Sequence, residues 1–495
     1  MTIATLSLLS LNDDQQQLVA FMRNQLVRYQ AVNQLKSDLY EGKFSAFDLG
    51  ISAPEGLPDL IEAVCGWPGT VVDVLEERLE FLGWAGIESD TLEQVAADNQ
   101  LQMEAGRGHL DGLIYGVSFV TVGSGDVSSG EPEVLITMES TTSCTVLWDY
   151  RKRRAMAALS QTTDVFGRIA WESLYLPNET IRFTRGADGR MVVEHRDYHG
   201  LGRVPVARLL NRDRASDPTG RSEITRAVKY LTSACIRTLA GMEVNREFYT
   251  SPKWTALNAD PEIFGMSANN SAAENRRKGW SATQGRLNVI PIQEGPDGEP
   301  VEVKLHEFRP APPTPYIEQA KCYSQMLSAE TGIPSPYLGF VTDNPSSADA
   351  IRQEEYRLVK RAERRQTSFG AGWMEVGRLT LMLRQEFDPD EFRKVSAKWR
   401  DAATPTRAAT ADETTKYIAA GVLPADSKVT LDRIGFTDVE QRQLEKDRRR
   451  SLVAQLVENA RNQPPTPPEP GAPGTPGQAA NQPPTPEPNR VIDRT

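Results

Sequence analysis

The chain has 495 residues, a formal net charge of −11 and a pI of about 5.2. This acidic balance excludes a protein that grips nucleic acid over its whole surface, because such proteins need excess cations to displace counterions. The length predicts about three domains. A hydrophobic content of 39% and a charged content of 25% are typical of a soluble chain with buried cores.

The charge is unevenly distributed along the chain. Residues 1–150 hold 23 acidic and 6 basic side chains, whereas the remainder holds 44 acidic and 50 basic side chains. A change of sign between segments indicates surfaces with different neighbours. A solvated acidic domain that is kept soluble by repulsion would explain the same numbers.

Residues 1–210 are predicted to pack helices on an antiparallel sheet. Apolar residues recur every three or four positions in the predicted helices, and short β-rich runs separated by turns follow them. The expected helices are 12–40, 68–82 and about 91–115, and the expected strands are 117–122, 133–138 and several within 144–210. We therefore expect a mixed α+β fold.

The second half alternates long helices with irregular segments. The patterns predict helices over 221–249, 313–330 and 346–386, a β-rich insert over 250–311, a break over 332–339, and smaller helices over 407–460. Gly370 and Gly372 lie within the longest helix and indicate either a kink or a close contact. Residues 461–495 hold 11 of the 33 prolines and are expected to be a disordered tail.

Sequence motifs for catalysis are missing. There is no G-x-x-x-x-G-K-[ST] phosphate loop, and the four cysteines at 65, 144, 235 and 322 lack zinc-type spacing. His195 and His199 stand four apart, but in a strand-and-turn region that does not suit a metal. The segment Pro389-Asp-Glu-Phe-Arg-Lys394, which combines carboxylates with a lysine, is expected to start a helix and not to form a nuclease site. We therefore expect no catalysis, no cofactor and no metal. No signal peptide and no membrane-spanning run are expected either.

Two long helical segments carry mixed charge. Residues 221–249 hold five basic and three acidic side chains, and residues 348–366 hold six basic and four acidic ones. These helices are either solvated, or they form a wall that lines something highly charged. Spacing alone does not decide between the two.

An ordered set of short motifs resembles the portal proteins of tailed bacteriophages, of the long-tailed type common among phages of actinobacteria. The resemblance covers roughly residues 15–450. Its most specific stretch is Thr331-Gly-Ile-Pro-Ser-Pro-Tyr-Leu-Gly339, followed by Asn344-Pro-Ser-Ser-Ala-Asp-Ala-Ile351 and Phe369-Gly-Ala-Gly-Trp373. Further agreement lies at Tyr40-Glu-Gly42, Val71-Val-Asp73, Gly202-Arg-Val-Pro-Val206 and Gly220-Arg-Ser-Glu-Ile224.

The resemblance implies a ring, usually of twelve subunits, that forms the DNA channel at one capsid vertex. It implies a wing (1–220 with 346–400), stem helices (221–249 and 312–331), a clip (250–311), a tunnel-loop region (332–347), a channel helix (348–400) and a crown (401–460). The implied partners are double-stranded DNA, the terminase, a head-completion protein, and the capsid and scaffold proteins. No membrane is implied.

The candidate functional residues follow from this resemblance. The candidates in the DNA-channel loop are Phe340, Val341, Thr342, Asp343 and Asn344, although Asn344 also fits a simple helix cap. The candidates on the channel helix are Arg352, Arg357 and Lys360. An acidic ring with few cations near the loop would let DNA slide, since each phosphate contact adds affinity. The alternatives are a nuclease of the phage head and a minor capsid protein that forms no channel.

Overall fold

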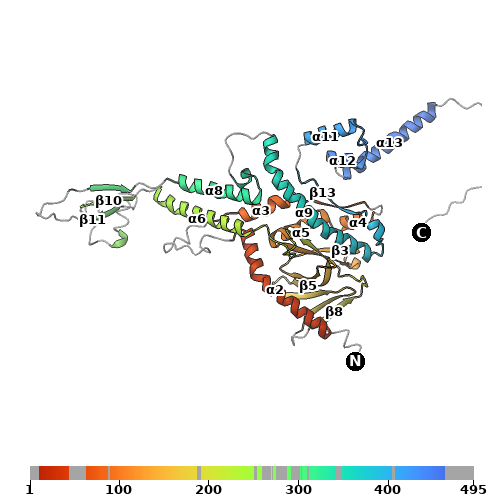
Figure 1. Cartoon of the computed structure of the whole chain (residues 1–495), viewed down its shortest axis with the longest axis horizontal. Coiled ribbons are helices and arrows are strands. Elements are labelled where there is room, and N and C mark those ends of the chain that lie inside the picture. The colour runs from red at the N-terminus through yellow and green to blue at the C-terminus, as the bar shows by residue number, and fades with distance from the viewer. Residues whose placement is uncertain are drawn as a thin grey trace, which may run out of the picture. The chain divides into compact units, whose positions relative to one another are not determined.

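The computed structural model describes most of the chain in two compact units, Met1–Ala403 and Thr404–Thr495 (Figure 1). The residues described are 11–43, 63–86, 90–186, 191–249, 253–258, 269, 271–274, 287–290, 302, 304–308, 312–339, 348–403, 407–436 and 438–462.

The first helix, α2 (Asp13–Tyr40), packs on a five-stranded antiparallel sheet. A capping box begins the helix: the Asn12 side chain accepts from the Gln15 N–H at 2.8 Å, and the Gln15 side chain accepts from the Asn12 N–H. Val19 and Met22 are buried against the sheet. The predicted helix over 12–40 is confirmed. The strand order is β4 (Cys144–Asp149), β5 (Arg154–Thr163), β6 (Ile169–Tyr175), β7 (Thr180–Arg185) and β8 (Met191–Asp197).

A second antiparallel sheet has the order β3-β2-β9, so β3 and β9 form its two edges. Its strands are β2 (Val117–Ser124), β3 (Val134–Glu139) and β9 (Val206–Leu210). Residues 125–133 connect β2 to β3 and contain a short 3₁₀ turn, η2 (Val127–Ser129). Because β2 and β3 pair antiparallel, this segment is a hairpin connection.

The predicted helix over 68–82 is wrong at its carboxyl end. Helix α3 (Trp67–Glu76) stops early, and β1 (Phe81–Ala85) pairs antiparallel with β13 (Ser396–Trp399). The apolar spacing of residues 79–82 fits a helix as well as a strand. The pairing partner, more than 300 positions away, decides the outcome.

The predicted helix over 91–115 is two helices, α4 (Thr91–Asp98) and α5 (Leu101–Tyr115). The backbone breaks at Gln100, which has φ of +49° in the left-handed region. Asn99 fixes this break. Its side-chain amide donates to the Val134 carbonyl at 2.8 Å, and its carbonyl accepts from the Ile136 N–H at 2.8 Å.

Helices α6 (Arg226–Tyr249) and α8 (Thr314–Thr331) pack against each other. Helix α6 begins five residues later than predicted, after Thr225, whose hydroxyl oxygen accepts from the Val228 N–H at 3.3 Å. The chain between the two helices contains a three-stranded sheet. Strand β10 (Lys253–Leu257) pairs parallel with β11 (Leu287–Ile290) and antiparallel with β12 (Lys304–Phe308).

The longest helix, α9 (Ala348–Leu383), supplies much of the main core. Its buried stripe consists of Leu358, Ala362, Phe369, Trp373, Val376 and Leu379, whereas Ile351, near the start of the helix, is exposed. At Gly372 a Cβ atom would lie well inside 3.0 Å of the Arg208 carbonyl oxygen in β9. This glycine therefore serves a close contact, one of the two roles expected for it. The short helix α10 (Pro389–Phe392) follows, capped by the Asp388 side chain.

The second unit contains α11 (Arg407–Ala419), α12 (Lys428–Ile434) and α13 (Asp438–Asn462). The Arg433 guanidinium pairs with Glu413 at 3.0 Å and joins α12 to α11. The Gln441 side chain donates to Asp432 at 2.6 Å and joins α13 to α12. The predicted tail beyond residue 462 lies outside the described residues.

Candidate functional site

The candidate site is the connection between α8 and α9. The predicted DNA-facing residues Phe340 to Asn344 lie outside the described residues, so their placement stays a prediction. The chain on both sides of them is described. On the α8 side it is held by side chains of α9.

Two arginines of α9 cap the carboxyl end of α8. The last four carbonyl groups of a helix lack intrahelical partners and carry partial negative charge. Arg357 donates to the Ala329 carbonyl at 2.6 Å, and Arg361 donates to the Thr331 carbonyl. The aliphatic part of Arg357 also lies over Gly332, whose φ of +74° ends the helix. The end of α8 is therefore fixed to α9.

A second contact holds the chain just before the undescribed segment. Residues Ser335–Leu338 form a 3₁₀ turn, η4. The Tyr337 hydroxyl donates to Glu355 of α9 at 2.5 Å, and Arg78 pairs with the same carboxylate at 3.2 Å. Burial raises the pKa of Tyr337, and the bond to Glu355 raises it further, so the phenol stays protonated. Tyr337 thus anchors the turn to α9.

A buried carboxylate lies beneath this connection. The Glu223 side chain is 0% exposed and lies just before α6. It accepts from Arg365 at 2.5 and 3.0 Å, from Arg361 at 2.6 Å, and from Arg212 at 3.5 Å. Arg361 therefore contacts both Glu223 and the end of α8. We call Glu223, Arg361 and Arg365 the Glu223 cluster; it joins the start of α6, the end of α8 and the middle of α9.

The electrostatics of the Glu223 cluster favour the ionised carboxylate. Burial alone raises the pKa of Glu223, but the charges of Arg365, Arg361 and Arg212 together outweigh it and lower that pKa. Burial also lowers the pKa of Arg361. Its guanidinium nevertheless stays charged, since arginine does not deprotonate in proteins.

The three candidate residues of the channel helix all lie in the amino-terminal half of α9, and their side chains are exposed. Arg357 bonds to α8 as described, and Lys360 pairs with Glu363 at 2.6 Å. Arg352 also has an interaction within the chain. Arg357 thus has a structural contact, and whether these residues face DNA stays a prediction.

Sequence reasoning missed the Glu223 cluster, although α9 carries a signal for it. Arg361 and Arg365 are four residues apart and lie among Leu358, Ala362 and Phe369, which form the apolar stripe. A charged residue on a buried stripe needs a partner of opposite charge. The partner, Glu223, is 138 positions from Arg361 and cannot be identified from spacing.

The fold also brings together two cysteines that are distant in sequence. Cys65, ahead of α3, hydrogen-bonds through its thiol to Cys235 of α6. This bond lowers the pKa of Cys65 and raises that of Cys235. Both thiols are free, and they join α6 to the segment before α3.

The segments that were not expected to take part in catalysis contain regular secondary structure. The segment 389–394 contains α10, and Asp390 pairs with Arg393 at 2.9 Å. His195 lies in strand β8. Among the described residues no three His, Cys, Asp or Glu side chains gather in a way that suits a metal ion. In the same part of the chain, no helix has the length and apolarity needed to cross a bilayer.

Comparison with known proteins identifies the family. Residues 72–452 match the family model "Phage portal protein, SPP1 Gp6-like". The portal protein of Mycobacterium phage D29 is 33% identical over 399 residues, covering 78% of this chain and 79% of the relative. The portal protein of Mycobacterium phage L5 is 32% identical over 390 residues, covering 76% and 77%.

A solved structure was also matched, a chain of the virion of a native gene transfer agent particle. It has a TM-score of 0.40 and 13% identity, and covers 75% of this chain and 90% of its own. The resemblance to portal proteins of actinobacterial phages is confirmed by the sequence relatives. The chain therefore belongs to the SPP1 Gp6-like family of phage portal proteins, which are structural components of the virion, form an oligomeric ring in the capsid and are not enzymes.

Proposed function

We propose that this chain forms the ring-shaped DNA channel at a unique capsid vertex, through which the genome is packaged and ejected. The observation that carries the proposal is the anchoring of residues 329–338, which lead into the predicted loop. Arg357 and Arg361 fix the end of α8, and Tyr337 fixes η4, all to one helix. A short segment held this way in a ring-forming family suits a loop that projects into the channel.

The parts of the chain then take separate roles. The antiparallel helices α6 and α8 act as the stem, and the sheet β10–β12 between them acts as the clip, which docks the terminase and later the head-completion protein. The two antiparallel sheets with α2, α5 and α9 act as the wing. The second unit acts as the crown, and capsid and scaffold proteins contact the assembled ring, in which we expect twelve subunits.

Passage of DNA requires weak contacts. Phe340, Val341, Thr342, Asp343 and Asn344 are the proposed DNA-facing residues of the loop. Arg352, Arg357 and Lys360 are the proposed DNA-facing cations on the adjacent helix. Because Lys360 is paired with Glu363 and Arg357 caps α8, few strong phosphate contacts remain near the loop. An acidic ring with these few cations binds DNA weakly and so allows it to move through the channel.

The first experiment is electron microscopy with native mass measurement on the purified chain, alone and with capsid and scaffold proteins. Closed rings with a central hole are expected. Persistent monomers in both conditions would contradict the channel and favour the minor capsid protein. On isolated rings, duplex DNA should bind weakly at physiological salt. Tight binding with a steep salt dependence would contradict the sliding surface.

The loop residues are tested by packaging assays in assembled particles. Asp343→Lys adds a cation where DNA is proposed to pass and should slow packaging while ring mass stays unchanged. The matched control is Asp412→Lys in α11, where the acidic residue is exposed and far along the chain from the loop. Equal packaging by both variants would remove Asp343 from the channel surface. Magnesium-dependent cleavage of DNA by the purified chain would instead support the nuclease alternative.

A further inference from the structure

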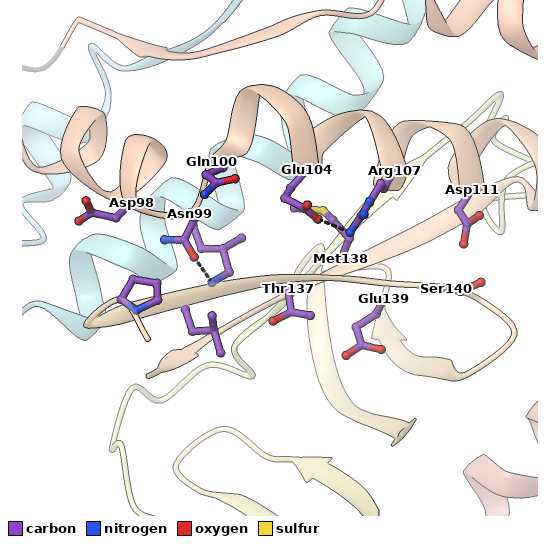
Figure 2. Close-up of a pocket in the computed structure, with 14 residues that line it drawn as sticks. Asp98, Asn99, Gln100, Glu104, Arg107, Asp111, Thr137, Met138, Glu139 and Ser140 are labelled. Carbon is purple, nitrogen blue, oxygen red and sulfur yellow. Dashed lines mark hydrogen bonds and ion pairs between the residues drawn. The ribbon is translucent and has the colours of Figure 1, made fainter. Parts of the chain in front are cut away.

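A groove with an acidic lining lies between helix α5 and strand β3. The cavity has a volume of about 490 Å³. Figure 2 shows Asp98, Glu104 and Asp111 on the helical side and Glu139 on the strand side. Arg107 is the basic residue in its lining, and it pairs with Glu104 at 3.0 Å. The groove therefore keeps an excess of negative charge.

The floor of this groove is an unpaired sheet edge. Strand β3 is the edge strand of the sheet β3-β2-β9. Asn99 bonds to the outward-facing carbonyl of Val134 and N–H of Ile136 and so covers the first part of the edge. Backbone groups two residues further along face the same way, so Met138 presents its N–H and carbonyl toward the groove. A strand edge of this kind favours an extended or hairpin segment.

A basic hairpin of the five-stranded sheet lies beside β9, the opposite edge strand of the sheet β3-β2-β9. The turn between β4 and β5 carries Arg151, Lys152, Arg153 and Arg154 in succession. The guanidinium of Arg208, in β9, stacks over the Trp148 ring, 3.8 Å from its centroid. It also lies 5.8 Å from the centroid of the Tyr150 ring, so this turn is held beside β9.

The shape of the turn is fixed, and its charges face outward. The Asp149 carboxylate accepts from the N–H groups of Arg151 and Lys152, each at 2.9 Å. Arg153 has φ of +51°. The side chains of Arg151, Lys152 and Arg153 are exposed, and within the described part of the chain Lys152 has just a loose pairing with Asp149, at 3.9 Å.

We infer that, in the ring, the basic hairpin of one subunit docks into the acidic groove of its neighbour. A closed ring of identical subunits repeats one heterologous contact, which joins two different surfaces of the chain. The groove and the hairpin meet this requirement because they lie beside opposite edge strands of the sheet β3-β2-β9 and carry opposite charge. The occupant is thus a second copy of this chain, and the inference rests on the ring of the proposed function.

Charge reversal with rescue tests this docking on the full chain. The hairpin variant Arg151→Glu with Lys152→Glu, and the groove variant Asp98→Lys with Thr137→Lys, place like charges across the contact. All four side chains are exposed. Each variant should raise the concentration needed for half-assembly by about tenfold or more, measured by sedimentation. All four changes in one chain should restore assembly, because opposite charges face each other again.

The matched control is Arg168→Glu, an exposed residue on the turn between β5 and β6 of the same sheet. It should leave assembly unchanged. Circular dichroism melting of each variant checks the fold. A second measurement joins Thr137→Cys to Arg151→Cys with a short bis-maleimide in a Cys322→Ser background. A ladder of covalent multimers is expected for the pair, and none for either cysteine alone.

The possible results distinguish a failure of the docking proposal from a failure of the channel proposal. Rings that form normally in both reversed variants, without a crosslinked ladder, would overturn the docking and leave the portal function intact. A hairpin variant that weakens duplex DNA binding but not assembly would overturn it as well, and would assign the basic turn to nucleic acid. Absence of rings from the parent chain, even with capsid and scaffold proteins, would overturn both.

Discussion

Loss of the Glu223 charge should destabilise the first unit strongly. In Glu223→Gln the side chain keeps its size, but two largely buried guanidinium groups, those of Arg361 and Arg365, lose their counterion. Removal of one partner from a buried ion pair costs about 3–5 kcal/mol, because the remaining charge stays buried. Arg212, at 3.5 Å and 32% exposed, contributes less, since solvent screens it.

The shift in melting temperature follows from the size of the unit. An unfolding entropy of about 2.1 cal/mol/K per residue over roughly 400 residues gives about 0.8 kcal/mol/K. The expected loss is therefore about 4–6 °C, measured by calorimetry at matched protein concentration. The control is Glu354→Gln, which removes the same charge from an exposed position on α9 and should shift the transition by less than about 1 °C.

The pH dependence has a defined sign. The pKa of Glu223 is lowered in the folded state, so its stabilisation is present above the ordinary carboxyl value of about 4.3 and is lost as the pH falls through the folded value. The difference in stability between the parent and Glu223→Gln should therefore be largest at neutral pH and decrease as the pH falls into the acid range. Equal melting temperatures at pH 7 would refute the view that this carboxylate holds the cluster.

Three further changes test other features of the fold. Burial lowers the pKa of His109 to about 3, so the parent should lose up to about 1.4 kcal/mol of stability per pH unit as the pH falls from about 6.5; His109→Gln should flatten this dependence in acid titrations. Gly372→Ala should cost about 1–3 kcal/mol of stability by forcing α9 away from β9. Gly370→Ala, whose added Cβ atom would have its nearest contact at 3.4 Å, should leave stability unchanged or raise it. Equal melting temperatures of the two variants would contradict this reasoning. Asn99→Ala should cost about 2–3 kcal/mol and promote aggregation, seen by light scattering, because it uncovers the β3 edge; a fully soluble variant of unchanged stability would count against it.

Local patterns in the sequence predict the long helices well. The apolar period of α2 and its Asn12 cap lie within one stretch of chain, and so does the buried stripe of α9 around Phe369. The strands of the second sheet were also predicted, because alternating β-rich runs and turn residues mark them locally.

The errors arise where distant residues decide the structure. Strand β1 was predicted to continue a helix, because its partner β13 lies at residues 396–399. The break at Gln100 has no proline or glycine to mark it, and Asn99 stabilises it through β3. The partner of Arg361 and Arg365 is equally remote. A single sequence shows that these arginines need a carboxylate, but not that Glu223 supplies it.

The arginine cap of α8 has a mechanical consequence. Helix α9 spans 36 residues, about 54 Å at 1.5 Å per residue. In its first half, Arg357 and Arg361 hold the carbonyls of Ala329 and Thr331 at the end of α8, while its far half is packed among aromatic rings of the core. A shift of α8 by one residue along its axis would break both arginine hydrogen bonds together. The contact between α8 and α9 therefore resists small displacements and is lost cooperatively. Force applied at the end of α8 is therefore transmitted through these arginines and along α9 into the core.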